Sequence, residues 1–367
     1  MKLLYILHTI SNYGGLARTI CHQANEFVRR FGFDVTVVTF NDMRDDGFEL
    51  NSKIHRVKLY YPIFGAPLAR RLSNTVRLRR ALKALIKEEK PDVTITLQNI
   101  KETGWISGYA PAGKTIVESH SNYAAQLPDD GGLTRKISNL FVRRLVKRAD
   151  RFVVLTQRDV ESYSYIRKSD YISNAVPFTT GKRADYTAKR VVAVGRIDAL
   201  KNFGDLVDIW ADIHCDFPEW TLRICGDGPE KELLMDRIRD LGLTESIEVG
   251  YTSDVMGEYL SSSIMAMTSK QEGMPMVLLE AAACGLPCIA FDCDNGPSEA
   301  IDDGKTGIVI PKWDKEMFVA GLRELMTDEE LRRKMGDAAV EKMEREYSDD
   351  VIMNLWNELF NSLITKK

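Results

Sequence analysis

The sequence predicts an α/β protein built from two Rossmann-like domains, each with a doubly wound parallel sheet. The chain of 367 residues is long for one domain and comfortable for two. Short apolar, β-branched runs alternate with helical segments in both halves, as in parallel strands that are buried on both faces. A polar, irregular stretch, 178–189, separates the halves, and the alternation of apolar runs and helical segments begins again after it. Because ligands of such sheets bind at the carboxyl ends of the strands, we expect the two domains to face a central cleft that holds the site.

Each expected element rests on this alternation of apolar runs and helical segments. In the first half, the expected strands are 3–8, 34–39, 92–97, 114–118 and 151–155, and the helices are 15–31, 68–89 and 133–147. In the second half, the expected strands are 190–194, 220–225, 246–249, 264–268, 287–291 and 307–310. Its expected helices are 203–217, 230–241, 253–262, 276–284, 316–327, 328–347 and 349–364. We therefore expect domains at 1–177 and 178–348, with 349–367 as a closing helical segment.

The net charge of −3 conceals an asymmetry between the halves. Residues 1–177 carry 28 Lys and Arg against 17 Asp and Glu, a net of +11, and the remaining residues carry 22 against 36, a net of −14. Many of the basic residues fall in 68–90 and 134–151. They form either solvated helix faces or a surface that attracts anionic lipid or a lipid-linked pyrophosphate acceptor. Nucleic acid is a weaker option, because no interleaving of aromatic and basic residues supports it.

The same composition predicts a cytoplasmic protein, at most peripheral at the inner face of a membrane. No run of eighteen apolar residues is present, and the N-terminal apolar segment is too short for a signal peptide. That segment suits a first buried strand instead. The six cysteines form no CxxC pair, which favours reduced thiols.

The most informative segment is 272–287, in which two carboxylates flank the start of a predicted helix. Pro275 suits the first turn, where its missing N–H would have no partner, and Gly285 suits the position after the helix end. Glu272 then lies in the loop before the helix, and Glu280 lies more than a turn inside it. The N–H groups of such a first turn favour an anion, typically phosphate. Here they belong to Met276, Val277 and Leu278. This layout suits a nucleotide sugar, which has hydroxyls at both ends and phosphate in the middle.

A glycine-led loop follows the first strand of the second half. Gly195 permits a sharp turn, so that Arg196 and Lys201 extend from the carboxyl end of the strand, and Asn202 precedes the next helix. Two fixed cations at this place would neutralise a leaving diphosphate. The plainer interpretation is a surface arginine and lysine that cap helix ends. The anion-binding helix start in the same half favours the functional interpretation.

Two further glycine turns follow strands. Gly226 and Asp227 begin a tight turn that lets the backbone approach a ligand, and Gly14 and Gly15 remove side-chain bulk after the first strand. Taken alone, the paired glycines more often make a mere tight turn. The chain has no G-x-G-x-x-G fingerprint and no G-x-x-x-x-G-K-[ST] loop. A nicotinamide dehydrogenase is therefore disfavoured, and a P-loop ATPase is excluded.

A histidine and an acidic loop complete the candidates. His120 follows the strand 114–118, which would place it at the cleft, although a lone histidine is more often structural. The segment 292–294, Asp-Cys-Asp, matches the D-x-D pattern of metal-dependent sugar transferases, but a turn is the simpler interpretation. No cluster has metal-ligand spacing. With two cations and a helix dipole at hand, we expect neither a metal nor another cofactor.

These segments resemble the retaining glycosyltransferases of family 4, which have the GT-B fold. The resemblance covers nearly the full chain. The residues that carry it, in the order of the family, are Gly14, Gly15, His120, Gly195, Arg196, Lys201, Asn202, the turn 226–229, Glu272 and Glu280. The segments 118–122, 272–280 and 291–299 look most like the amylovoran-type galactosyltransferase branch. That branch is associated with bacterial exopolysaccharide and capsule assembly.

The resemblance implies that the second half binds the nucleotide sugar and the first half binds the acceptor. Arg196 and Lys201 would hold the diphosphate. Glu280 would accept hydrogen bonds from the ribose hydroxyls, and Glu272 would contact the donor sugar. The C-terminal helix would cross back to the first domain.

The resemblance also implies further contacts with the donor. Gly250 and Tyr251 would meet the base, and His120 would approach the sugar from the acceptor side. The backbone around sugar and phosphate would be that of Gly273, Met274, Pro275, Met276 and Val277. Much of the family has Gly-aromatic-Gly at 273–275, so Pro275, which lacks a backbone donor, puts one of these contacts in doubt.

The reaction that the resemblance implies moves a hexosyl group from a nucleotide diphosphate sugar, with UDP preferred, to a hydroxyl of a glycan or lipid-linked acceptor. The anomeric configuration would be retained. Glu272 would either attack the anomeric carbon or orient the sugar, and we favour orientation, with diphosphate oxygens taking the acceptor proton. Two alternatives stay open: a GT-B-type UDP-sugar epimerase, which needs no acceptor, and a non-catalytic sugar-nucleotide-binding protein.

Overall fold

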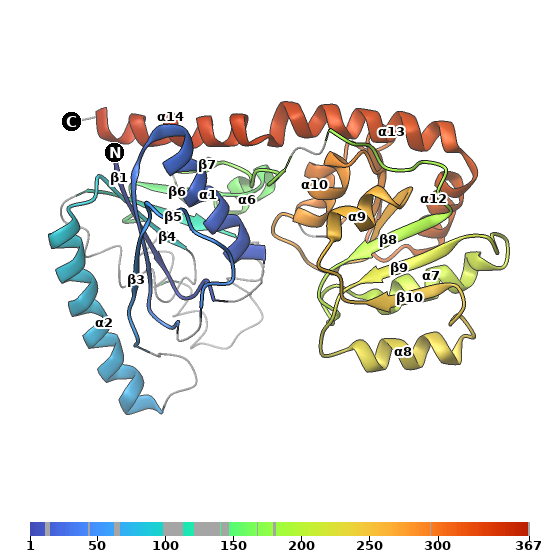
Figure 1. The fold of residues 1–367 in the computed structure, drawn as a ribbon, viewed down its shortest axis with the longest axis horizontal. Helices are drawn as coiled ribbons and strands as arrows, with labels where there is room; N and C mark the ends of the chain where they lie inside the picture. The colour runs from blue at the N-terminus through green and yellow to red at the C-terminus, as the bar shows by residue number, and fades with distance from the viewer. Residues whose placement is uncertain are drawn as a thin grey trace. The chain divides into compact units, whose positions relative to one another are not determined.

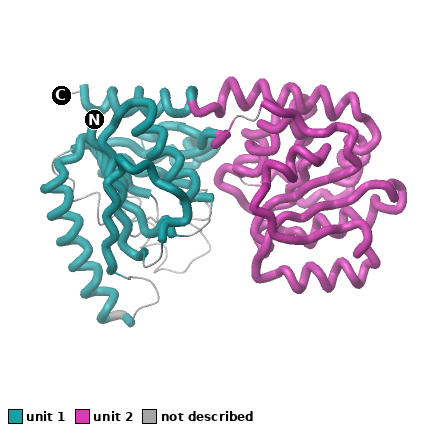
Figure 2. The backbone as a smooth tube through the Cα atoms, in the orientation of Figure 1, with its two compact units in different colours: residues 1–175, 350–367 teal, residues 176–349 magenta. Residues whose placement is uncertain are grey.

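The structure is a computed structural model, which describes residues 1–11, 15–42, 45–61, 67–97, 113–120, 140, 147–166, 168–178, 181–293 and 295–365. The chain forms two compact units (Figure 2), one of residues 1–175 with 350–367 and one of residues 176–349. The first unit therefore combines stretches from both ends of the chain. The expected boundaries, after residues 177 and 348, lie one or two residues from the observed ones.

The first unit is built on a sheet of seven parallel strands in the order β3-β2-β1-β4-β5-β6-β7. The strands are β1 (Lys2–Leu7), β2 (Asp34–Thr39), β3 (His55–Lys58), β4 (Val93–Leu97), β5 (Lys114–Ser119), β6 (Arg151–Val154) and β7 (Ser169–Tyr171). Five of them match the expected strands. The edge strands β3 and β7 were not predicted, because they are short and contain no buried residue, so that no apolar run marks them.

Helices cover both faces of this sheet (Figure 1). Those in the described residues are α1 (Gly15–Phe31), α2 (Leu68–Glu89), α6 (Gln157–Ser162) and α14 (Asp349–Thr365). Alternate residues of β1 point to opposite faces, so that Tyr5 packs with α1 and α14 while Leu4 packs with α2. Phe360 of α14 meets Phe27 of α1 edge-on, with 5.3 Å between ring centroids, so the end of the chain completes the core around its beginning. The helix expected at 133–147 lies outside the described residues, apart from 140 and 147.

The longest helix of the described residues, α2, carries its charged side chains on the side that faces away from the sheet. Leu78, Leu82 and Ile86 are buried on one side of the helix. The other side exposes Leu72 and Val76 together with a set of basic residues. That set is Arg70, Arg71, Arg77, Arg80, Lys83 and Lys87. Neither α2 nor any other helix in the described part of the chain has the length and apolarity that a bilayer crossing requires.

The second unit repeats the design with six parallel strands in the order β10-β9-β8-β11-β12-β13. The strands are β8 (Arg190–Val194), β9 (Thr221–Cys225), β10 (Ile247–Gly250), β11 (Ile264–Met267), β12 (Cys288–Phe291) and β13 (Gly307–Ile310). All six coincide with expected strands. Each is rich in apolar residues, and those of β11 and β12 are buried along their whole length.

The helices of the second unit differ from the expectation at several places. They are α7 (Phe203–His214), α8 (Lys231–Asp240), α9 (Val255–Leu260), α10 (Met276–Ala283), α11 (Pro297–Ala300), α12 (Lys315–Thr327), α13 (Glu329–Lys342) and the π-turn η1 (Met343–Tyr347). α7 ends three residues early, because Pro218 follows and disfavours helix before it. The single turn α11 was not predicted, and the helix expected at 328–347 finishes as η1.

The sheet of the second unit is buried between two layers of helices. Trp210 of α7, Leu234 of α8 and Phe318 of α12 are buried in the core on one face. Figure 1 shows α9 and α10 on the side opposite α7 and α8, and their residues Tyr259 and Leu278 are fully buried there. Burial on both faces explains why the strands read as continuous apolar runs.

In both sheets the first strand of the unit lies in the middle, with β1 between β2 and β4, and β8 between β9 and β11. The next two strands of each unit are added towards one edge of the sheet. The strands that follow are added on the other side of the first strand, towards the opposite edge. Open parallel sheets bind ligands at the carboxyl ends of the strands where this direction reverses. In the second unit, the segments at this switch point are the loop after β8, residues 195–202, and the loop after β11, residues 268–275.

Candidate active site

Hydrogen bonds tie together the two loops at the switch point of the second sheet. The N–H of Lys270 donates to the carbonyl of Leu200 at 2.7 Å. The hydroxyl of Thr268 donates to the carbonyl of Asn202 at 3.0 Å, and Asn202 Nδ2 donates to the carbonyl of Thr268 at 3.3 Å. Asn202 has φ of +53°, a left-handed conformation that asparagine tolerates better than most residues. These three hydrogen bonds therefore hold the two loops together, and Asn202 takes part in two of them.

The cation and the carboxylate predicted in these loops meet each other. Lys201 Nζ lies 2.6 Å from Glu272 Oε1, and the two side chains are 23% and 11% exposed. A Cβ at Gly195 would lie 3.3 Å from the Cδ and Cε atoms of Lys201, so the missing side chain makes room for the lysine stem. Arg196 differs, because its side chain is 72% exposed and its Nε is 3.8 Å from Asp198 Oδ2. Of the two cations expected to be fixed, only Lys201 is held in the site.

The glycines of the turn after β9 are required by the loop after β8. A Cβ on Gly226 would lie 1.9 Å from the carbonyl oxygen of Gly195, and a Cβ on Gly228 would lie 2.3 Å from that of Ile197. The N–H of Ile197 also donates to the carbonyl of Asp227 at 2.9 Å. The turn therefore supports the loop that carries Lys201, which is a structural reason for residues that the sequence assigned to ligand binding.

The start of α10 offers two backbone donors to a ligand where three were expected. Pro275 is the N-cap residue, with extended backbone (φ −76°, ψ 92°), and so lies just before the first turn in which we expected it. Its carbonyl accepts from the N–H of Leu278 at 2.9 Å, so this donor is already used. Met276 and Val277 remain as the donors of the first turn. Gly285 follows the helix end with φ of +82°, as predicted.

Glu280 lies in the second turn of α10 and is buried. Tyr259, a fully buried residue of α9, donates its hydroxyl to Glu280 Oε2 at 3.4 Å. Burial raises the pKa of Tyr259 well above its usual value, and the charge of Glu280 adds to this effect. The tyrosine therefore stays protonated as a donor and helps to orient the carboxylate.

At the end of β10, Gly250 is held by neighbouring residues and is followed by the aromatic residue Tyr251. The carbonyl of Gly250 accepts from the N–H of Gly226 at 3.0 Å. Arg223 Nη1 lies 3.3 Å from the position of a Cβ on Gly250, and Glu258 holds this arginine at 3.1 Å. The side chain of Tyr251 is 74% exposed and so is accessible to a flat ligand.

The loop after β12 packs against the loop that precedes α10. Gly296 has φ of +99°, and a Cβ there would lie 2.3 Å from Cδ of Pro275 and 3.2 Å from the carbonyl oxygen of Gly273. Met274 between them is buried. The D-x-D candidate begins just before this contact at Asp292, but its last residue, 294, lies outside the described residues.

In the first unit, the structure describes part of what the sequence predicted. Gly14 lies outside the described residues, and Gly15 is the first residue of α1. His120 directly follows β5, and its Nε2 lies 2.9 Å from Oε1 of Glu118. Both side chains are largely buried, 9% exposed for His120 and 1% for Glu118.

Sequence reasoning missed three supporting residues of the second unit, namely Tyr259, Thr268 and Gly296. Tyr259 is an aromatic residue in a short helix, and Thr268 follows a buried strand, so neither carries a local signal. Their partners, Glu280 and Asn202, are 21 and 66 residues away in the sequence. Only the dipeptide Gly-Pro at 296–297 marked a turn at Gly296, and it did not indicate which loop the turn meets.

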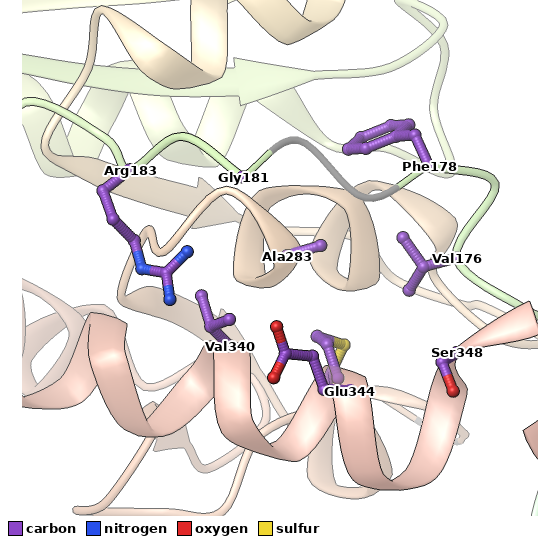
Figure 3. A pocket seen from close by; sticks show the side chains of 9 residues that line it. Val176, Phe178, Gly181, Arg183, Ala283, Val340, Glu344 and Ser348 are labelled. Carbon is purple, nitrogen blue, oxygen red and sulfur yellow. The ribbon is translucent and has the colours of Figure 1, made fainter.

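Among the cavities lined by described residues of the second unit, two adjoin the segments discussed above or α10. One of about 160 Å³ adjoins the loop after β8 and is lined by Asp198, Phe203, Leu234 and Arg237, among others. Another of about 50 Å³ lies between the segment 176–183 and the helices α10, α13 and η1 (Figure 3). Its lining includes Arg183 and Glu344. Both are smaller than the 300–1,000 Å³ or so that ligand pockets usually occupy, so neither is a candidate for a whole nucleotide sugar.

Two protein-family models match the chain, one in each unit. The "Glycosyl transferase 4-like domain" matches residues 14–166, and "Glycosyl transferases group 1" matches residues 181–342. Together they cover most of the chain, in an order that follows the two units.

Relatives match over the full length. The chain is 32% identical over 377 residues to the amylovoran biosynthesis glycosyltransferase AmsD of Erwinia amylovora, a match that covers 98% of this chain and 99% of that protein. It is 23% identical over 346 residues to the GalNAc-alpha-(1->4)-GalNAc-alpha-(1->3)-diNAcBac-PP-undecaprenol alpha-1,4-N-acetyl-D-galactosaminyltransferase of Campylobacter jejuni, over 93% of each chain.

Solved structures share the fold. HepE of Anabaena in complex with UDP matches with a TM-score of 0.78 over 99% of this chain and 100% of that one. At 16% identity, this likeness shows the fold alone. Because a full-length relative shares 32% identity and a glycosyltransferase model matches each unit, the chain belongs to the family 4 glycosyltransferases and has the GT-B fold.

Proposed function

We propose that this glycosyltransferase moves a hexosyl group from a UDP-sugar to a hydroxyl of a growing glycan or lipid-linked acceptor, with retention of the anomeric configuration. The ion pair of Lys201 with Glu272, beside the start of α10, carries this proposal. It brings a cation, a carboxylate and a helix N-terminus to the switch point of the second sheet. A sugar attached to a diphosphate needs this combination, because one end presents hydroxyls and the other presents negative charge.

The diphosphate would occupy the start of α10. The N–H groups of Met276 and Val277 and the helix dipole favour an anion there, and Lys201 adds a full positive charge. Arg196 is exposed and can extend to a second phosphate. These groups would stabilise the charge that develops on the leaving diphosphate, so we propose that the enzyme needs no metal ion.

The two glutamates would bind hydroxyls at opposite ends of the donor. As the diphosphate attracts Lys201, Glu272 Oε1 becomes available to accept hydrogen bonds from the donor sugar. Glu280, oriented by Tyr259, would accept from the ribose. The unequal surroundings of the glutamates support unequal roles, since one is paired with a movable lysine and the other is buried beside a tyrosine.

In the transfer step, the bond between the anomeric carbon and the diphosphate oxygen breaks, and the acceptor oxygen bonds to the same face of that carbon. The acceptor proton moves to an oxygen of the departing diphosphate. Glu272 would orient the sugar and would not attack it. Mass spectrometry of the protein with donor alone tests this assignment, because a hexosyl adduct on Glu272 would contradict it.

The relatives support an acceptor in the assembly of a cell-surface polysaccharide. One is named for amylovoran biosynthesis, and another is named for a substrate linked through pyrophosphate to undecaprenol. A lipid-linked acceptor places the reaction at the inner face of a membrane. The exposed cations of α2 support peripheral contact with anionic lipid, since each adds about 1 kcal/mol of attraction near such a surface.

A panel of nucleotide sugars tests the activity. We expect one UDP-sugar to stabilise the protein against heat and to be consumed only when a glycan or polyprenyl-diphosphate acceptor is added. An isomeric sugar formed without acceptor would identify an epimerase. UDP binding without any product would identify a binding protein, and failure of every donor to bind or react would refute the proposal.

Liposome co-sedimentation tests the membrane contact. The protein should pellet with vesicles that contain phosphatidylglycerol and should not pellet with phosphatidylcholine alone. The variant Arg77→Glu/Arg80→Glu/Lys83→Glu should lose this binding. The matched variant Arg239→Glu/Lys305→Glu/Lys334→Glu, with three exposed cations of the second unit reversed, should retain it. Equal binding of both variants would exclude α2 as the contact surface.

A further inference from the structure

A buried carboxylate in the first unit has no evident structural purpose. Glu118 lies near the end of β5, and the residues opposite it are Leu97 on β4 and Val153 on β6, which carry no charge. Its side chain is 1% exposed, and its Oε2 has no hydrogen-bond partner among the described residues. Burial of a carboxylate costs free energy that an apolar or amide side chain would avoid. A group of this kind that contributes little to stability is a candidate for a role in function.

The nearest titratable partner of Glu118 is the histidine that sequence analysis selected. His120 Nε2 lies 2.9 Å from Glu118 Oε1, and the imidazole is 9% exposed. The two atoms are in contact but are not aligned as a hydrogen bond. Catalytic hydrogen bonds are often poorly aligned before the substrate binds and improve when it does.

Among the described residues, Tyr5 on β1 also interacts with Glu118. Tyr5 shares the face of the sheet that packs against α1, and its hydroxyl donates to Gln23 Oε1 at 2.9 Å. Burial raises the pKa of Tyr5 well above its usual value, and the charge of Glu118 contributes to this rise. Since the tyrosine proton is directed at Gln23, Glu118 is left to accept from His120.

We propose that Glu118 is a positioning residue for His120, which holds the imidazole in the Nε2–H tautomer and leaves Nδ1 for a hydroxyl of the ligand. A carboxylate only accepts hydrogen bonds, so the nitrogen that faces it must carry the proton. In a neutral imidazole, the other nitrogen is then an acceptor. This inference rests on the proposed function and on the expectation from the family resemblance that His120 meets the sugar from the acceptor side, and it assigns the atom that makes the contact.

The geometry gives a different expectation from a purely structural role. If Glu118 served only packing, the isosteric variant Glu118→Gln would change neither the tautomer of His120 nor the dependence of the rate on pH. If Glu118 positions His120, the amide can offer its N–H to Nε2, and the preference for the Nε2–H tautomer disappears. The loss of a buried charge should leave the melting temperature unchanged or raise it.

Nitrogen-15 NMR of protein with labelled histidine rings tests the tautomer without any substrate. In the wild type, the His120 ring should show the Nε2–H pattern at alkaline pH, and Glu118→Gln should show a mixture or the Nδ1–H form. Tyr5→Phe is the control, because it removes a hydroxyl from the same face and leaves the carboxylate in place. The same tautomer in wild type and Glu118→Gln would overturn the proposal.

Steady-state kinetics supply the second measurement. We expect Glu118→Gln to lower kcat by about tenfold or more, to change the shape of the pH–rate profile and to change the KM for the donor less than kcat. In a His120→Ala background, Glu118→Gln should have no further effect, whereas an additive loss would contradict the proposal. Should the wild type transfer no sugar at all, the proposed function fails, while the NMR result still decides the role of Glu118.

Discussion

The two units share one design and use it differently. Each places its first strand in the middle of a parallel sheet and braces the loop that follows it. In the second unit, the brace is made by close approaches to the backbone of the loop after β8, which require Gly226 and Gly228 to lack side chains, and this loop carries Lys201 of the Lys201–Glu272 pair. In the first unit, the loop after β1 is held by a buried carboxylate, since Asp42 accepts from the N–H of Ile10 at 3.1 Å.

Under the proposed function, this difference would let one scaffold serve two halves of a transfer reaction. Glycine contacts in the second unit let loops approach closely, and the charged side chains beside them are those that we propose for the diphosphate. The first unit has an excess of basic residues, and its Glu118–His120 contact is the one that we propose for an uncharged hydroxyl. The four predictions that follow test this contrast.

The largest effect is expected from the ion pair of the second unit. Lys201→Ala and Glu272→Ala should each lower kcat about 100-fold to 1,000-fold, because each removes a group that we propose to act on the reacting donor. The double variant should be less impaired than the product of the single effects, since the two side chains contact each other. Initial rates with a saturating donor measure this coupling. The control is Lys334→Ala, which changes an exposed lysine on α13. If the losses in the double variant were additive, Lys201 and Glu272 would act independently of each other.

A second prediction concerns the close approach of Gly226 to Gly195, by which the turn after β9 supports the loop after β8. Gly226→Ala should destabilise the second unit by about 1–3 kcal/mol and weaken donor binding, because its Cβ would overlap the carbonyl oxygen of Gly195. Thermal unfolding and calorimetry with UDP measure the two effects. Gly204→Ala is the matched control, since nothing lies within 4 Å of its Cβ and alanine favours the helix α7. Equal behaviour of the two variants would refute the role of the brace.

The third prediction concerns the support of Glu280. Tyr259→Phe should raise the KM for the donor about fivefold, which corresponds to the loss of one hydrogen bond of about 1 kcal/mol. The value of kcat should change less, because the ribose lies away from the reacting carbon. Tyr163→Phe, at another buried tyrosine in the first unit, should leave this KM unchanged. An unaltered KM in Tyr259→Phe would show that Glu280 needs no orientation by the tyrosine.

The smallest effect is a dependence of stability on acid in the first unit. Burial opposes ionisation of Glu26, but hydrogen bonds from Arg29 and Arg30 outweigh it and lower its pKa from 4.5 to about 2. Because the pKa is lower in the folded state, this stabilisation is present above pH 4.5 and is lost as the pH falls towards 2.

Urea unfolding at pH 7 and pH 3 measures this effect. Glu26→Gln should reduce the difference in stability between the two pH values, whereas Glu49→Gln, at an exposed position of the same unit, should preserve it. A difference that is unchanged in Glu26→Gln would place the acid-sensitive group elsewhere.

The predicted architecture was accurate where burial leaves a local pattern. The strands of the second sheet were all predicted, because a strand that is buried on both faces reads as an apolar run. The edge strands β3 and β7 were missed, because their residues are polar and partly exposed. The start of α10 was predicted to the residue, but Pro275 proved to be its N-cap, since its extended ψ angle is not visible in the sequence.

The sequence by itself determined the sheet-forming segments, the ends of α10 and the chemical types that the site would contain. These follow from local rules, namely apolar periodicity, the backbone limits of glycine and proline, and the charge of a helix start. The tertiary structure alone decided that Lys201 meets Glu272 across 71 residues, that Tyr259 supports Glu280, and that Arg196 remains in solvent. Such contacts depend on the order in which parallel strands lie side by side, and side-chain types in a linear chain do not specify that order.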